Sequence, residues 1–231
     1  MLTKKQWQRK QRRKKYLMLI TVTTLTMLII LSVIMMSVTV VKNINKPFNS
    51  VLGFIQASKP IAKPEISEML LTPNDYSRPQ TPLTAVNSIV IHYTANPGTG
   101  AESNRNYFEN LRLNQTTSAS SHFVIGLEGE IIQCVPLDEI SYASNDRNND
   151  TISIECCHPD ETGKFNEKTY QSLVALIAWL CSVYNLDRDD IIRHYDVSGK
   201  LCPLYYVEHE DAWETLKDDV IAYKTEHAVE D

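Results

Sequence analysis

The amino-acid sequence predicts an α/β domain built on a mixed β-sheet flanked by helices and preceded by one transmembrane helix. Three observations support this prediction. From about residue 86 onward, short apolar runs alternate with amphipathic stretches, a pattern typical of strands and helices around one sheet. A run of 26 residues, 16–41, contains no charged residue. The 231 residues are 43% hydrophobic and 22% charged, which excludes a wholly disordered or collagen-like protein.

The first fifteen residues form a basic segment. They contain eight lysines and arginines and no acidic residue, which leaves a net charge of −13 on the rest of the chain. An acidic main body argues against nucleic acid as a partner, because nucleic-acid-binding domains cluster Lys and Arg on their folded part. The basic segment therefore needs another explanation.

The uncharged run 16–41 provides that explanation, because it is predicted to be a transmembrane signal anchor. As a helix it would extend about 39 Å, enough to cross a hydrocarbon core of about 30 Å. A cleaved signal peptide would have a shorter apolar region and a small-residue cleavage site, and no Ala-x-Ala stands near Val40. The preceding cations favour a cytoplasmic amino terminus. We therefore expect a single-pass protein of the cell membrane with an extracytoplasmic domain.

Residues 42–82 contain six of the ten prolines and are predicted to be an extended tether that does not pack into a core. The chain then divides into a cytoplasmic basic segment (1–15), a signal anchor (16–41), an extracytoplasmic tether (42–82), the folded domain (83–225) and a tail (226–231). No internal repeat is visible.

Four strands are predicted in the folded domain, at residues 88–92, 122–127, 130–135 and 151–157. The second and third strands are separated by Glu128 and Gly129, which predict a hairpin turn. In the fourth strand, alternation places Glu155 on the face opposite Ile152 and Ile154.

Three helices are predicted, at residues 102–113, 167–184 and 208–223. In the second helix, apolar residues recur at spacings of three and four, and Asn166 is the expected N-cap. The first helix is expected to turn four apolar side chains inward: Tyr107, Phe108, Leu111 and Leu113.

Three residues suit a zinc site. His92 ends a hydrophobic strand, and His194 follows another short apolar run eight residues before Cys202. Imidazole and thiolate are good zinc ligands, and three protein ligands leave the fourth tetrahedral position for water. Each histidine taken alone is better explained as an ordinary hydrogen-bonded residue, so the spacing by itself does not establish a site.

The order of several short motifs adds the missing context. They are Ile91-His92-Tyr93-Thr94, Ser121-His122-Phe123-Val124-Ile125, Ile152-Ser153-Ile154-Glu155 and Arg193-His194-Tyr195-Asp196 followed by Lys200-Leu201-Cys202-Pro203. Over residues 86–220 this series resembles the zinc-dependent N-acetylmuramoyl-L-alanine amidases of the amidase-2 and peptidoglycan-recognition-protein family. The resemblance implies a zinc site at one end of a peptidoglycan-binding groove, with His92, His194 and Cys202 as Zn²⁺ ligands.

Two further residues are candidates for catalysis. Glu155 lies between apolar strand neighbours, where a carboxylate is costly without a function or a partner, and it is the expected general base and acid. Lys200 lies two residues before the thiolate and is expected to stabilise the oxyanion. The alternatives are an edge-strand carboxylate on the surface and a solvated loop lysine.

The resemblance has departures and leaves some roles open. Ser121 stands where one branch of the family has a catalytic Tyr, and Ala143 stands where relatives commonly have His. His122 is expected to pack or to contact substrate, and Tyr93 is a second candidate for substrate binding. The four remaining cysteines either stay buried free thiols or form one disulfide: Cys134, Cys156, Cys157 and Cys181.

The sequence therefore predicts a membrane-anchored zinc hydrolase that cleaves the amide bond between N-acetylmuramic acid and L-alanine in bacterial peptidoglycan. Its expected partners are muropeptides and the cytoplasmic membrane. One alternative is a non-catalytic peptidoglycan-binding module of the same fold, but such relatives characteristically lack the cysteine ligand that Cys202 would supply. A zinc peptidase is the other alternative, and it is disfavoured because the sequence has no His-Glu-x-x-His motif.

Overall fold

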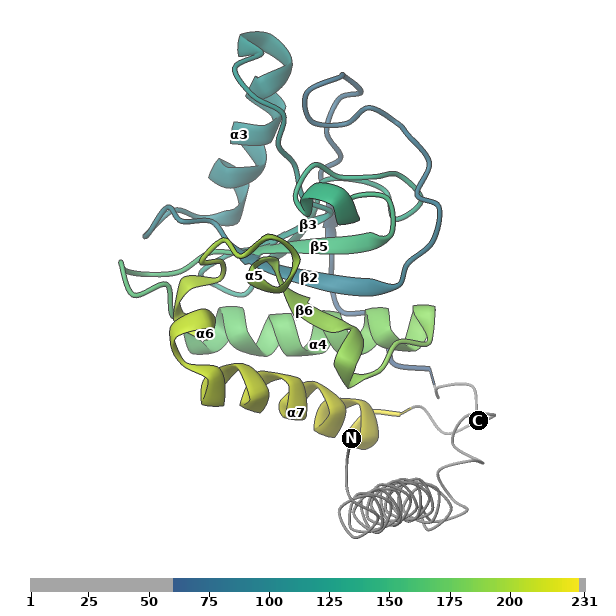
Figure 1. Cartoon of the computed structure of the whole chain (residues 1–231), viewed down its shortest axis with the longest axis vertical. Coiled ribbons are helices and arrows are strands. Elements are labelled where there is room, and N and C mark those ends of the chain that lie inside the picture. Colours follow the sequence, from purple (N-terminus) through teal and green to yellow (C-terminus); the bar gives the residue numbers. More distant parts are fainter. Residues whose placement is uncertain (1–59, 229–231) are drawn as a thin grey trace, which may run out of the picture. The chain divides into compact units, whose positions relative to one another are not determined.

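The computed structural model describes residues 60–228, which contain a six-stranded mixed sheet with helices on both faces (Figure 1). The strands are β1 (Ser67–Glu68), β2 (Ser88–Tyr93), β3 (Phe123–Ile125), β4 (Ile131–Gln133), β5 (Thr151–Cys156) and β6 (Ile191–Arg193). The helices are α3 (Ala101–Asn114), α4 (Glu167–Tyr184), α5 (His194–Ser198), α6 (Leu204–Glu208) and α7 (Glu210–Glu226), with 3₁₀ helices η1 (Asn145–Arg147) and η2 (Arg188–Asp190). This architecture confirms the predicted α/β fold.

The sheet has the strand order β1-β4-β3-β5-β2-β6. Only β3 and β4 pair in antiparallel fashion, and the other neighbours are parallel. Strands β5 and β2, the fourth and fifth in this order, are parallel neighbours, with His92 directly opposite Glu155. Both strands are almost wholly buried, as expected for parallel strands that have helices on both faces.

The hairpin between β3 and β4 has a wider turn than the sequence predicted. Residues 126–130 form the connection, and the Gly126 N–H donates to the Glu130 carbonyl at 2.8 Å. Helix α4 holds this loop open, because Thr169 donates to the Gly126 carbonyl at 2.8 Å and Ser172 donates to the Gly129 carbonyl at 2.7 Å. The predicted strand pair is confirmed, whereas the two-residue turn at Glu128 and Gly129 is wrong.

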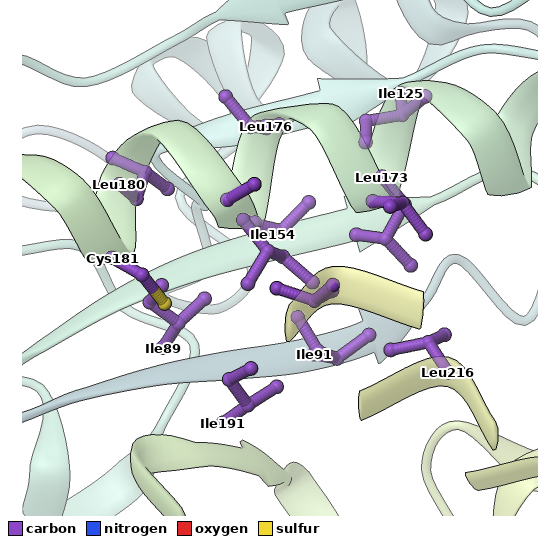
Figure 2. Close-up of a cluster of buried hydrophobic side chains, with 14 of the residues drawn as sticks. Ile89, Ile91, Ile125, Ile154, Leu173, Leu176, Leu180, Cys181, Ile191 and Leu216 are labelled. Carbon is purple, nitrogen blue, oxygen red and sulfur yellow. The ribbon is translucent and has the colours of Figure 1, made fainter. Parts of the chain in front are cut away.

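The larger core lies between the sheet and helices α4 and α7 (Figures 1 and 2). Figure 2 shows strand residues such as Ile91 and Ile154 facing Leu173 of α4 and Leu216 of α7. Each of these four side chains is fully buried. Burial of one such side chain contributes about 1.5–3 kcal/mol, so this face of the sheet supplies much of the stability of the domain.

Helix α4 has the bounds that the sequence predicts, because local signals mark both ends. The Asn166 side chain accepts a hydrogen bond from the Thr169 N–H at 2.9 Å, which confirms the N-cap. The C-cap, Asn185, adopts a left-handed backbone with φ of 54°. The last predicted helix is shifted: α7 begins at Glu210, and the short helix α6 precedes it.

Helix α3 covers the other face of the sheet, where it packs on a smaller core (Figure 1). Its buried residues are Ala101, Asn104, Phe108 and Leu111, one stripe at spacings of three and four. The inward positions predicted for Phe108 and Leu111 are confirmed. Those predicted for Tyr107 and Leu113 are wrong, because both lie outside the stripe and are 50% and 68% exposed.

Residues 60–82 pack against the domain, so the prediction that the proline-rich stretch stays out of the core is wrong for this part. Strand β1 pairs with β4, and Leu71 is 1% exposed in the smaller core. Arg78 forms a salt bridge with Glu139 at 2.7 Å. These contacts satisfy backbone and charged groups that an extended tether would leave to water. The rest of the predicted tether, 42–59, lies outside the described residues.

The predicted basic segment and signal anchor, residues 1–41, also lie outside the described residues. Within residues 60–228, no helix is long and apolar enough to cross a membrane. The five cysteines are all buried and free. This arrangement matches the alternative of free thiols for the four that were not assigned to zinc.

Candidate metal centre and active site

The three predicted ligands are brought together by the topology of the sheet. His92 is the penultimate residue of β2, and His194 is the first residue of α5, directly after β6. Strands β2 and β6 are parallel neighbours, so their carboxyl ends lie at the same edge of the sheet. Cys202 follows α5, and its sulfur lies 3.8 Å from His92 Nδ1.

A short, well-anchored loop returns the chain from His194 to Cys202. Helix α5 ends at Ser198, and the φ of 77° at its C-cap, Gly199, allows the chain to reverse. The Tyr195 N–H then donates to the Cys202 carbonyl at 2.9 Å. Arg193 fixes the start of the loop through ion pairs to Asp196 at 2.9 Å and to Glu210 of α7 at 2.6 Å.

The donor atoms of His92, His194 and Cys202 all lie within 4.8 Å of one another. The two imidazole rings have centroids 4.7 Å apart and are tilted by 59°. All three residues are buried, with exposures of 2%, 6% and 2%. Tetrahedral zinc ligands with bond lengths of about 2.0–2.3 Å lie roughly 3.3–3.8 Å from one another, so only a small closure is needed.

The polar atoms of this cluster fit a divalent metal. One nitrogen of each imidazole, His92 Nε2 and His194 Nδ1, is buried without a hydrogen-bond partner. Burial lowers the pKa of both histidines, with a further contribution from the charge of Lys200, which favours the neutral form of the ring that can ligate a metal. Burial raises the pKa of the Cys202 thiol to about 12. A cation would reverse this by favouring the thiolate, with release of a proton.

Glu155 lies beside the cluster on the same side of the sheet as His92. Its neighbours in β5 confirm the predicted alternation, because Ile152 and Ile154 belong to the larger core on the opposite face. The Glu155 Oε2 atom is buried and has no hydrogen-bond partner. Burial raises the pKa of this carboxyl from 4.5 to about 8, against the opposing effect of the Lys200 charge.

Lys200 lies on the exposed loop between α5 and Cys202. Its positive charge acts on the pKa of all three candidate ligands and of Glu155. The Lys200 charge therefore lies near enough to the cluster to act on its ionisable groups, and its predicted role at the oxyanion stays a prediction.

His122 directly precedes β3 and is not a member of this cluster. Its ring nitrogens contact the Glu139 carbonyl at 3.0 Å and the Ser153 and Ser141 hydroxyls at 3.1 Å each. The side chain is fully buried, with no ring nitrogen left for a ligand. The packing alternative therefore describes His122, and we do not retain it as a substrate contact.

Tyr93 is half-buried at the end of β2 and packs against the larger core. Its ring lies 5.1 Å from that of His158. Its backbone N–H approaches the Cys202 sulfur and lowers the pKa of that thiol, partly offsetting the effect of burial. Tyr93 therefore contacts the cluster through its backbone N–H.

Sequence analysis missed one residue at the cluster, Asn145 of η1. Its Oδ1 lies 2.7 Å from His194 Nε2. No motif surrounds Asn145, and 49 residues separate it from His194. A signal for this contact was therefore absent from the sequence.

Comparison with known proteins gives one family. The profile of the family described as N-acetylmuramoyl-L-alanine amidase matches residues 82–204. The N-acetylmuramoyl-L-alanine amidase CwlL of Bacillus licheniformis is 32% identical over 169 residues, covering 66% of this chain and 46% of that protein. The amidase BlyA of Bacillus subtilis (strain 168) is 33% identical over 170 residues, covering 64% and 45%. The chain thus spans a little under half the length of these relatives.

Solved structures are similar over the same part of the chain. The catalytic domain of XlyA superposes with a TM-score of 0.57 at 28% sequence identity, covering 68% of this chain and 99% of that one. PlyL superposes with a TM-score of 0.58 at 26% identity, covering 68% and 97%. The match to nearly the whole of both structures indicates that the folded part of this chain corresponds to one complete domain.

Proposed function

The chain belongs to the Amidase_2 family of N-acetylmuramoyl-L-alanine amidases, and we propose that it hydrolyses the amide bond between N-acetylmuramic acid and L-alanine in peptidoglycan. The observation that carries this proposal is the buried cluster of His92, His194 and Cys202 with the unpartnered carboxyl of Glu155 beside it. The proposed cofactor is Zn²⁺, which this donor set suits.

In this proposal His92, His194 and Cys202 hold the zinc ion. Zinc, when bound, supplies Lewis-acid chemistry: it lowers the pKa of water and polarises the carbonyl of the scissile amide. The chain would contribute two neutral imidazoles and one thiolate. Because all three residues are buried, water would screen a metal charge held by them only poorly.

Glu155 moves the proton in the proposed reaction. Its carboxylate accepts a proton from the attacking water, and the resulting carboxyl donates that proton to the leaving amine of L-alanine. A group that does both needs a pKa near the working pH. Burial raises the pKa of Glu155 to about 8, and a nearby cation would lower it toward neutrality.

Lys200 stabilises the negative charge that develops on the carbonyl oxygen. Its exposed position leaves the ammonium free to approach the substrate, and its charge already acts on Glu155 and the ligands. A cation beside the developing negative charge favours the transition state over the bound substrate. We therefore expect loss of Lys200 to reduce turnover more than binding.

One experiment separates hydrolysis from simple binding. The purified full-length chain is incubated with muropeptides, with and without a chelator, and product masses are measured. We expect a free stem peptide with an L-alanine amino terminus, and no such product with chelator. Retention of intact muropeptide on a zinc-loaded protein would instead support the non-catalytic binding module, and cleavage within the stem peptide would indicate a peptidase.

The proposed location is the cell membrane, with the amino terminus inside and the domain outside. It rests on the charge pattern of residues 1–15 and 16–41. Protease added to intact protoplasts should digest a carboxyl-terminal epitope tag and spare an amino-terminal one. Protection of both tags would place the domain in the cytoplasm.

A further inference from the structure

His194 has two differently placed ring nitrogens. Nε2 lies 2.7 Å from the Asn145 side-chain oxygen, whereas Nδ1 is buried and has no partner. An amide oxygen only accepts hydrogen bonds, so Nε2 carries the hydrogen and Nδ1 carries the lone pair. We propose that Asn145 is a positioning residue that holds His194 in the tautomer and ring orientation needed to bind a metal.

This inference rests on the proposed zinc site for its functional consequence, although the hydrogen bond itself does not depend on a metal. A metal-ligating imidazole generally donates its other N–H to an oxygen, and loss of that partner typically weakens metal binding about 10–100-fold. Of the His92 ring nitrogens, Nδ1 contacts the Cys202 sulfur at 3.8 Å and Nε2 has no hydrogen-bond partner. Asn145 contacts only the His194 ring of the two, which makes His92 an internal comparison.

The segment that carries Asn145 is held in place independently of His194. Asn148 accepts hydrogen bonds from the Ala143 and Ser144 N–H groups at 3.1 and 2.6 Å. Arg147 donates to the Ser88 hydroxyl of β2 at 3.1 Å. These contacts anchor the turn to the sheet, so Asn145 is presented to His194 by a fixed part of the fold.

The backbone of Asn145 explains why a short amide occupies this position. Its φ is 50°, in the left-handed region that few residues other than Gly, Asn and Asp adopt readily. Gly at this position would remove the side chain without adding backbone strain, whereas Ala would add strain. Asn185, the C-cap of α4, has a similar φ of 54° and is exposed, so Asn185→Gly is a matched control.

The first test measures zinc affinity of the full-length chain by competition with a chelating dye. Asn145→Gly should weaken zinc binding about 10–100-fold, and Asn185→Gly should leave it within about twofold of wild type. Asn145→Asp keeps an oxygen acceptor and should retain wild-type affinity or exceed it. An Asn145→Gly protein that binds zinc within about twofold of wild type would overturn the proposal, because water would then serve equally well.

The second test needs no metal and follows the ¹⁵N chemical shifts of the imidazoles at alkaline pH, where both rings are neutral. In the metal-free wild type, His194 should be protonated at Nε2. Asn145→Gly should give a mixture of tautomers at His194 with no change at His92. Protonation of wild-type His194 at Nδ1 would refute the inference. If the wild type binds no zinc, the proposal that zinc is the cofactor is refuted. The tautomer measurement still tests whether Asn145 fixes the protonated nitrogen of His194.

Discussion

Substitution of Glu155 by Gln should make the metal-free protein more stable and the enzyme nearly inactive. Burial raises the pKa of Glu155 from 4.5 to about 8. Between these pH values the folded protein keeps a proton that the unfolded chain has released. The stability of the wild type therefore falls as the pH rises through this window.

The size of the effect follows from the pKa difference. Each pH unit between the two pKa values is worth about 1.4 kcal/mol, so the penalty is about 1 kcal/mol at pH 5 and about 3 kcal/mol at pH 7. Gln keeps the shape of the protonated carboxyl and cannot ionise. The free energy of unfolding of Glu155→Gln should exceed that of the wild type by up to these amounts.

Two assays test the predicted changes in stability and turnover. Urea unfolding of the metal-free proteins at pH 5 and pH 7 measures the stability difference, and muropeptide hydrolysis at full zinc occupancy measures turnover. Turnover of Glu155→Gln should fall about 10²–10⁴-fold, the usual contribution of a positioned acid and base. Glu65→Gln, at an exposed position, is the control and should change neither quantity.

If Glu155 is a structural carboxylate, both the stability result and the turnover result should be reversed. Glu155→Gln would then lose stability at pH 7, because a useful ionic or hydrogen-bonded contact would be gone, and turnover would stay within about threefold of wild type. That outcome would refute the assignment of Glu155 as general base and acid. Another group would then have to move the proton, and Lys200 would be the first to test.

Three further predictions concern the ligand cluster, the buried side chain of His122 and helix α4. Cys202→Ala should lose the bound zinc, as measured by metal analysis of the purified protein, and an equal zinc content in both proteins would remove Cys202 from the site. Burial lowers the pKa of His122 from 6.5 to about 4, so stability should fall by up to about 3 kcal/mol as the pH drops through this window. Unfolding of His122→Gln at pH 7 and pH 4 should lack this component, and an unchanged pH dependence would contradict it. Asn166→Ala should lower the free energy of unfolding by about 1 kcal/mol, measured by urea denaturation, because the Thr169 N–H loses its acceptor; no loss would show that water replaces the cap.

Much of the fold could be predicted because its determinants are local. The bounds of α4 follow from a capping Asn166 and a regular apolar spacing, and both act within one or two turns of chain. Strand β2 contains the continuous apolar run 89–91, as expected for a parallel strand covered on both faces, and in β5 the alternation of Ile152 and Ile154 with polar residues marks the face of the larger core. In such segments the sequence pattern and the tertiary environment demand the same residues.

The predictions were wrong where burial of a residue depends on tertiary packing and not on the local sequence pattern. Tyr107 and Leu113 are apolar residues of a real helix, but only the position of α3 on the sheet determines which stripe is buried. Likewise, the proline-rich composition of residues 60–82 correctly indicates an extended chain. Whether an extended chain remains free or pairs with a sheet edge, as β1 does with β4, depends on a strand more than sixty residues away.

The residues of the candidate site also differ in whether the sequence alone could identify them. His92, His194 and Cys202 could be recognised because few residue types bind zinc, so chemistry restricts these positions wherever the chain brings them together. The partner of His194 is not restricted in this way, since any oxygen acceptor in reach would fix the same tautomer. In this chain the acceptor is an amide on an anchored turn with a left-handed backbone, which selects Asn from among the residues that could accept. A motif therefore identifies the ligands, whereas only the folded geometry identifies the residue that orients one of them.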